Sequence, residues 1–227
     1  SFEYLLDFLN DFFDYFLDVL NKKGIYDGKA VVIQPREGGK CALLNAQDCK
    51  YNLYLRGIEN GEVKQDHNLI ESISRGIDPY KNYDEYISLA DNPDFRFIVS
   101  NTTEAGIAFD PDCNFIDKPC KSFPGKLTQL LYKRYKNGME GFTFLPCELI
   151  DNNGDALKKC ITKYADHWNL EKGFVDWLEN SNTFANTLVD RIVTGYPDDD
   201  TVKKHPDDKF LDTAELFHLW VIEGDFE

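Results

Sequence analysis

The hydrophobic and polar positions of this chain recur with two spacings, one helical and one strand-like. Near the start, apolar residues recur at helical spacing from Leu5 to Leu20, and Gly24 ends the run. Aspartates fall between them at steps of four, three and four: Asp7, Asp11, Asp14 and Asp18. This spacing puts the carboxylates on one face of a helix. We therefore expect an amphipathic core helix with a solvated acidic face and no metal site.

Further along, short β-prone runs alternate with helical runs. The expected strands are 30–33, 51–56, one or more return strands within 62–73, 95–100 and 142–146, with a hairpin turn at 60–61. The expected helices are 78–90, 124–136 and 155–168. Helices between strands are typical of an α/β domain with a mainly parallel sheet. We expect 30–33, 95–100 and 142–146 to be neighbours in that sheet.

Composition narrows the classes of partner. The chain has 227 residues, with 40 acidic and 25 basic side chains and a net charge of −15. It contains no Lys or Arg run, so we expect no nucleic-acid partner. No charge-free apolar stretch of about 18 residues occurs, so we expect no membrane span. Because an acidic surface repels anions, a site for a sugar acid would need its own local cation.

The number and spacing of the cysteines indicate the redox state of the cellular compartment. There are six, and they include no CxxC pair: Cys41, Cys49, Cys113, Cys120, Cys147 and Cys160. No histidine stands at a zinc-finger spacing from them. A chain of this size with an α/β pattern does not need disulfides, and its first residues lack the basic start of a signal peptide. We therefore expect reduced thiols in a cytoplasmic protein, without a metal.

A polar loop follows the strand expected at 95–100. It supplies donors and acceptors in a row: Asn101, Thr102, Thr103 and Glu104. Gly106 closes it and lets the backbone pass close to a ligand. Open α/β sheets bind ligands at such loops, at the carboxyl ends of strands. The alternative is an ordinary surface turn.

Five stretches together resemble one family. They are AVVIQPR at 30–36, SNTTEAGI at 100–107, PCELIDNNGD at 146–155, TLVDRIVTGYP at 187–197 and FLDTAE at 210–215. In this order they are similar to the tagaturonate reductase (altronate oxidoreductase) branch of the long-chain mannitol dehydrogenase family, from about Asn21 to the end. The resemblance implies a Rossmann-like dinucleotide-binding domain at 1–197. It also implies that 198–227 form a linker and the start of a helical substrate domain.

The resemblance further implies an NAD-dependent oxidoreductase that interconverts tagaturonate and altronate, with NAD and a small sugar acid as ligands. The implied cofactor-binding residues are Gln34, Pro35, Arg36, Asn101, Thr102, Thr103 and Glu104. The implied substrate-binding residues are Asn153, as an oxyanion-type donor, Asp190 and Arg191. The alternatives are helix capping for Asn153 and a structural ion pair for Asp190 and Arg191.

Two departures from the family pattern matter. The family's glycine-rich first turn, which brings pyrophosphate close to backbone N–H groups, has no counterpart in residues 2–7. The family's catalytic lysine helix is also not found, so no catalytic residue is assigned and the chain alone is expected to be inactive. Within the enzyme class, fructuronate reductase or a mannitol-type polyol dehydrogenase is the alternative. Outside it, the alternative is a non-catalytic fragment or a nucleotide-binding module without turnover.

Overall fold

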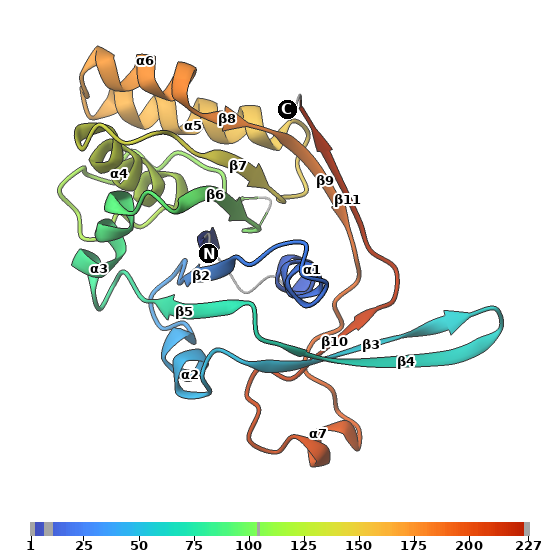
Figure 1. Cartoon of the computed structure of the whole chain (residues 1–227). Coiled ribbons are helices and arrows are strands. Elements are labelled where there is room, and N and C mark those ends of the chain that lie inside the picture. The colour runs from blue at the N-terminus through green and yellow to red at the C-terminus, as the bar shows by residue number, and fades with distance from the viewer. Residues whose placement is uncertain (1–2, 7–10, 104, 225–227) are drawn as a thin grey trace.

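Six parallel strands form the central sheet of the protein (Figure 1). The computed structural model describes residues 3–6, 11–103 and 105–224. In sheet order the strands are β5 (Ile73–Ile77), β2 (Lys29–Ile33), β1 (Glu3–Leu6), β6 (Phe95–Ser100), β7 (Thr143–Pro146) and β8 (Thr183–Phe184). Every pairing between them is parallel. The predicted α/β class with a mainly parallel sheet is therefore confirmed.

The start of the chain differs from expectation. Leu5 lies in β1, not in a helix, and pairs with Val31 on one side and Ile98 on the other. The expected helix start is therefore wrong, because pairing with two neighbouring strands overrides local helical periodicity. β1 also separates β2 from β6, so these two share a sheet but are not adjacent as predicted, whereas β6 and β7 are adjacent. Asp7 lies outside the described residues.

The helix that follows, α1 (Asp11–Lys22), is confirmed, but its acidic face is not solvated. Asp14 and Asp18 are both buried. The Tyr51 hydroxyl lies 3.3 Å from a carboxylate oxygen of Asp14. Asp18 accepts a hydrogen bond from the Glu71 backbone N–H at 3.0 Å and forms an ion pair with Lys22 at 2.5 Å. The predicted helical spacing is correct. The face of α1 that packs inward nevertheless includes Asp14 and Asp18, because other parts of the protein donate hydrogen bonds to their carboxylates.

Helices cover both faces of the sheet. On one face lie α3 (Tyr83–Ser88), α4 (Phe123–Lys136), α5 (Asn153–His167) and α6 (Lys172–Ser181), and on the other lie α1 and α2 (Cys41–Ala46). Successive residues of β2 point to opposite faces. Val31 and Ile33 join the core under α3 to α6, whereas Ala30 and Val32 join the core under α1 and α2. The sheet is thus buried on both sides, as parallel sheets are.

A second, three-stranded sheet packs on the α1–α2 side and extends away from it (Figure 1). It comprises β10 (Asp212–Glu215), β3 (Tyr51–Glu59) and β4 (Glu62–Ile70). The predicted hairpin is confirmed, with Asn60 and Gly61 at φ 57° and 82°. Antiparallel strands β9 (Asn186–Asp190) and β11 (Leu219–Glu223) form a ribbon, and α7 (Thr201–Lys204) is short. Residues 212–223 thus pair back onto β3 and β9.

Most of the remaining predictions were close. The helices expected at 124–136 and 155–168 correspond to α4 and α5. The helix expected from Asp78 instead begins at Tyr83, because the Asn82 side chain accepts from the Glu85 N–H and caps it there. The return strand expected within 62–73 ends at Ile70, and β5 then joins the main sheet.

Candidate functional site

The polar loop after β6 is fixed by a buried carboxylate. Glu148, which follows β7, is 2 % exposed. It accepts a hydrogen bond from the Ser100 hydroxyl at 3.0 Å. It also accepts from the Thr102 N–H at 3.0 Å and from the Thr102 hydroxyl at 2.8 Å. Hydrogen bonds to an ionised carboxylate are among the stronger ones in proteins, so Glu148 holds the β6 loop against the end of β7.

Asn153 continues this network at the start of α5. It is 1 % exposed, and the two N–H groups of its amide nitrogen are shared among the carbonyls of Pro146, Glu148 and Thr187, at 2.9, 3.1 and 2.9 Å. Its oxygen accepts from the backbone N–H groups of Gly154 and Thr187. The helix N-cap position belongs to Asn152, which has φ 51°. Asn153 therefore joins β7, α5 and β9 through backbone contacts, and its substrate role stays a prediction.

The loop after β2 is shaped by a buried amide. Gln34 is 3 % exposed, donates to the Arg36 carbonyl at 2.9 Å and accepts from the Cys41 N–H at 3.3 Å. A Cβ on residue 39 would lie 2.5 Å from Cδ of Gln34, so glycine is required for the loop to close over this side chain. Gln34 therefore sets the path of 35–40, while Arg36 is exposed beside it.

The predicted cofactor residues come together at the carboxyl ends of β2 and β6. A cavity of about 370 Å³ is lined by Pro35, Arg36, Asn101, Thr102, Thr103 and Lys121, among others. A neighbouring cavity of about 530 Å³ is lined by Gln34, Pro35, Arg36, Tyr196 and residues 209–212, among others. The two cavities share Pro35 and Arg36. Glu104 lies outside the described residues.

This position is the switch point of the sheet. The chain runs outward from β1 to β2 and β5 on one side and to β6, β7 and β8 on the other. Loops that leave neighbouring strands in opposite directions open a crevice between them, where α/β proteins bind ligands. Arg36 and Lys121 bring two positive charges to the cavity against one negative charge from Asp110, and the threonines supply hydroxyl groups. The site therefore suits a ligand that combines anionic and hydroxyl groups.

The other predicted substrate residues lie elsewhere. Asp190 is exposed at the end of β9, opposite Leu219 of β11. The Arg191 guanidinium donates to the Glu215 carbonyl at 3.2 and 3.3 Å and lies 4.8 Å from the ring centre of Tyr15. Neither residue lines either of the two cavities at β2 and β6.

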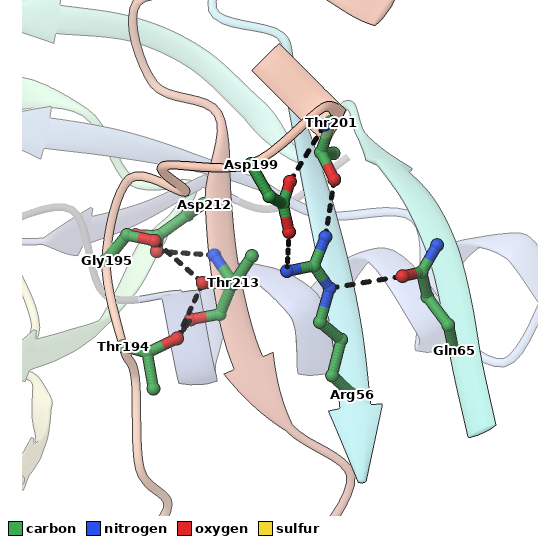
Figure 2. Close-up of polar contacts among 8 residues, drawn as sticks. All are labelled: Arg56, Gln65, Thr194, Gly195, Asp199, Thr201, Asp212 and Thr213. Atoms are coloured by element: carbon green, nitrogen blue, oxygen red, sulfur yellow. Dashed lines mark hydrogen bonds and ion pairs between the residues drawn. The ribbon is translucent and has the colours of Figure 1, made fainter. Parts of the chain in front are cut away.

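Sequence reasoning missed the anchoring of the acidic segment after β9. Figure 2 shows Arg56 of β3 bound to Asp199 and Thr201, at 2.7 and 2.5 Å, with Gln65 at 3.1 Å on its other side. Hydrogen bonds from Thr201, together with Arg56, lower the Asp199 pKa to about 2. Nearby, Thr213 bonds to the Gly195 carbonyl (Figure 2). The linker-like segment at 198–208 is therefore docked onto β3, and residues 209–212, which follow it directly, line the 530 Å³ cavity.

Two histidines also meet in this region. His67 of β4 stacks on the Tyr54 ring with centroids 4.6 Å apart, and the Tyr54 hydroxyl lies 2.9 Å from Nε2 of His205. The two imidazole centres are 5.3 Å apart. Burial, and next the charge of His205, lowers the pKa of His67. The sequence carried no signal for this pair, because the two histidines stand 138 positions apart and belong to no common motif.

A larger cavity, of about 830 Å³, lies at the amino ends of β6 and β7. Among its lining residues is Arg134, which is 2 % exposed. Its guanidinium donates to the carbonyls of Asn92, Phe95 and Glu140 and lies 4.1 Å from the Phe142 ring centre. These contacts give it a structural role, and this edge of a parallel sheet is not where ligands usually bind.

The thiols and the described helices add two observations. All six cysteines are free and buried. Burial raises the pKa of Cys41 and of Cys147 to about 12, so these thiols are protonated at neutral pH. Among the residues that the structure describes, there is no cluster of three or more metal-ligating side chains, and no helix has the length and apolar character to cross a bilayer.

Comparison with known proteins places this geometry in a family. The family model of the mannitol dehydrogenase Rossmann domain matches residues 11–227. Altronate oxidoreductases from Phocaeicola vulgatus and Bacillus subtilis are 47% and 45% identical over 226 residues, 96% of this chain. The chain spans 47% of their length. A solved structure with the same fold is mannitol 2-dehydrogenase of Pseudomonas fluorescens, in a ternary complex with NAD and D-mannitol. The TM-score is 0.84 and the sequence identity is 23%, and the match covers 99% of this chain and 49% of that chain.

Proposed function

This chain belongs to the mannitol dehydrogenase family, in its Rossmann domain, and on that premise we propose that it is the nucleotide-binding part of an NAD-dependent oxidoreductase that interconverts tagaturonate and altronate. The observation that carries the proposal is the pair of adjoining cavities at the switch point, because they unite residues from the ends of β2 and β6. When bound, the cofactor would supply a hydride as NADH to reduce tagaturonate, or accept one as NAD⁺ in the reverse direction.

The residues present fit a dinucleotide. Arg36 and Lys121 offer charge to a pyrophosphate, and Thr102 and Thr103 offer hydroxyl groups to polar parts of the ligand. Because both cavities are lined by Pro35 and Arg36, an extended ligand would reach from one loop to the other. Glu148 and Gln34 would act from behind these loops, by holding their backbones in place.

The choice of substrate rests on similarity. The relatives at 45–47% identity are named altronate oxidoreductases, and this chain carries the SNTTEAGI and TLVDRIVTGYP stretches of that branch. Fructuronate reductase and mannitol-type polyol dehydrogenase are the alternatives within the class. We propose contacts from Asn153, Asp190 and Arg191 to the sugar acid. For Asn153 this requires that one of its present backbone partners gives way.

The domain division and the compartment are part of the same proposal. Residues 1–197 would form the dinucleotide-binding unit and 198–227 the connection to a substrate domain, anchored by the pairing of β10 and β11 with β3 and β9. Six free thiols support a reducing compartment, and we propose the cytoplasm.

Titration with NADH tests the proposal. Binding should quench tryptophan fluorescence and should compete with ADP-ribose, and Arg36→Ala should weaken it while Arg75→Ala, on β5, should not. Absence of NADH binding by the unaltered chain would contradict the nucleotide-binding function. If NADH binds but no sugar acid or polyol is turned over even by a longer form of the protein, the chain is a nucleotide-binding module without turnover. The glycine-free sequence at 2–10 would weaken pyrophosphate binding in either case.

A further inference from the structure

Lys126 is a buried lysine directly behind the candidate cofactor site. It lies in the first turns of α4 and is 1 % exposed. Its ammonium donates to the Pro35 carbonyl at 2.8 Å, the Lys121 carbonyl at 3.0 Å and the Tyr80 hydroxyl at 3.2 Å. It also lies 5.3 Å from the centre of the Tyr80 ring. An ammonium has three N–H donors, and here each has an acceptor.

The two carbonyl partners belong to opposite parts of the cavity wall. Pro35 follows β2 and Lys121 precedes α4, and both line the 370 Å³ cavity. The chain connects them only through many intervening elements, so their separation is not fixed by local structure. The Tyr80 hydroxyl also donates to the Pro35 carbonyl, at 3.1 Å. One side chain therefore joins the β2 loop, the turn before α3 and the loop before α4.

Two further contacts hold the backbone of α4 at Lys126. The Ser122 hydroxyl caps α4 by accepting from the Gly125 N–H at 3.1 Å. The Tyr86 hydroxyl of α3 donates to the Lys126 carbonyl at 2.9 Å. Losing the ammonium would remove the Lys126 donor from the Lys121 carbonyl and would leave the Pro35 carbonyl with the Tyr80 hydroxyl alone. The loops would then relax relative to one another.

We propose that Lys126 is a positioning residue that sets the spacing between the β2 loop and the loop before α4, and thereby the affinity of the site for the phosphate-bearing part of a dinucleotide. This inference rests on the proposed function. Lys126 acts through Pro35 and Lys121, which line the cavity, while its own ammonium is committed to the protein.

The test compares the NADH dissociation constants of the full chain and its variants at low temperature. Near-UV circular dichroism checks that each variant is folded. Lys126→Met should weaken binding ~10-fold or more, the equivalent of one charge-assisted hydrogen bond. Tyr80→Phe, which removes one acceptor and one donor of the same network, should weaken it by about twofold to fivefold. Lys133→Met, on the exposed side of α4, should have no effect.

Ile161→Val serves as the control for stability alone. It trims a buried side chain of α5 that does not line the cavity, so it should lower the melting temperature but leave the NADH dissociation constant unchanged. A folded Lys126→Met variant that binds NADH within about twofold of the unaltered chain would overturn the inference. If that variant does not fold, unchanged binding by Tyr80→Phe overturns it instead. No NADH binding by the unaltered chain would overturn the proposed function, and the inference with it.

Discussion

The carboxylate of Glu148 accepts both the backbone N–H and the hydroxyl of Thr102, at 3.0 and 2.8 Å. Because Glu148 follows β7 and Thr102 follows β6, this pair locks two neighbouring strand ends together at the edge where the cavities open. Lys126 plays a similar part on the other side of the site, because its ammonium donates to the carbonyls of Pro35 and Lys121 in two different loops. One buried anion and one buried cation thus hold the loops of the site from behind.

Replacing Glu148 by glutamine should weaken the site. The amide keeps the shape but loses the charge, and its NH₂ group cannot accept from Thr102. We expect the free energy of unfolding to fall by about 1.5–3 kcal/mol, the range for a hydrogen bond to a charged group, and NADH binding to weaken about 10-fold. Urea denaturation and fluorescence titration measure the two effects.

Glu179→Gln, at an exposed ion pair with Lys158, is the matched control and should change stability by less than about 1 kcal/mol. Equal behaviour of the two variants would show that Glu148 does not organise the loop.

Asn153 should prove essential to the fold whatever its role with substrate. Asn153→Ala removes partners from carbonyls and N–H groups of β7, α5 and β9 that are largely buried. Each orphaned group costs about 1–3 kcal/mol, so we expect a loss of about 4 kcal/mol or more in unfolding free energy. Asn180→Ala, whose amide makes one exposed bond to the Asp176 carbonyl, should cost less than about 1 kcal/mol. A small effect at Asn153 would mean that its network is readily replaced, for instance by water.

Several of these features were readable from the sequence and others were not. The Asn60–Gly61 hairpin followed from local turn chemistry, which needs positive φ at both residues. The loop at 101–103 was recognisable because it directly follows an apolar strand. β1 was not, since Leu5 fits the helical spacing of α1 and only pairing with β2 and β6 makes it a strand.

The buried charges escaped prediction for a different reason. Asp18, Lys126 and Glu148 are residue types that are usually exposed, and their partners lie in distant parts of the chain. Residues 198–208 were similarly misleading, because an acidic sequence resembles a linker until Arg56 is placed beside Asp199. The sequence alone does not show which distant carbonyl or carboxylate a side chain will contact in the folded protein.

The histidine pair should make stability fall on mild acidification. The pKa of His67 is lowered from 6.5 in the folded protein, chiefly by burial and next by His205. The unfolded chain therefore takes up the proton first, so stability is present above about pH 6.5 and is lost as pH falls toward the folded pKa. Other charges near His67 are Asp66, which opposes the shift, and Lys204 and Lys22, which add to it. Urea denaturation from about pH 8 to about pH 5 should show a smaller decline for His67→Asn than for the unaltered chain. An equal decline would assign the effect to other groups.

The contact between Arg56 and Asp199 should control the order of the segment at 198–209. The Asp199 pKa is lowered to about 2 from 3.8, so this contact is present above pH 3.8 and is lost as pH falls toward 2. At neutral pH, Asp199→Asn should speed amide hydrogen exchange in this segment while leaving β2 and β6 protected. Asp207→Asn, which lies in the same segment and is exposed, provides the comparison. Unchanged exchange in Asp199→Asn would indicate that the other contacts of the segment are enough to dock it.

Finally, the 227-residue chain alone should not reduce tagaturonate at a useful rate. Hydride transfer to a carbonyl needs a group that donates a proton within hydrogen-bond reach, and such help contributes about 10²–10⁴-fold. The described residues that line the 370 Å³ cavity include no histidine, cysteine or tyrosine, and their ionisable side chains are Arg36, Asp110 and Lys121. The glycine-free sequence at 2–10 removes a second contribution, because charged hydrogen bonds from backbone N–H groups to pyrophosphate are worth about 1.5–3 kcal/mol each. The two losses act on different steps and should compound.

The rate is measured as the decrease in NADH absorbance with tagaturonate, and separately with fructuronate and fructose. Turnover of about 1 s⁻¹ or faster, which is within the usual enzyme range, would show that this part of the protein contains a proton donor that the present geometry does not identify.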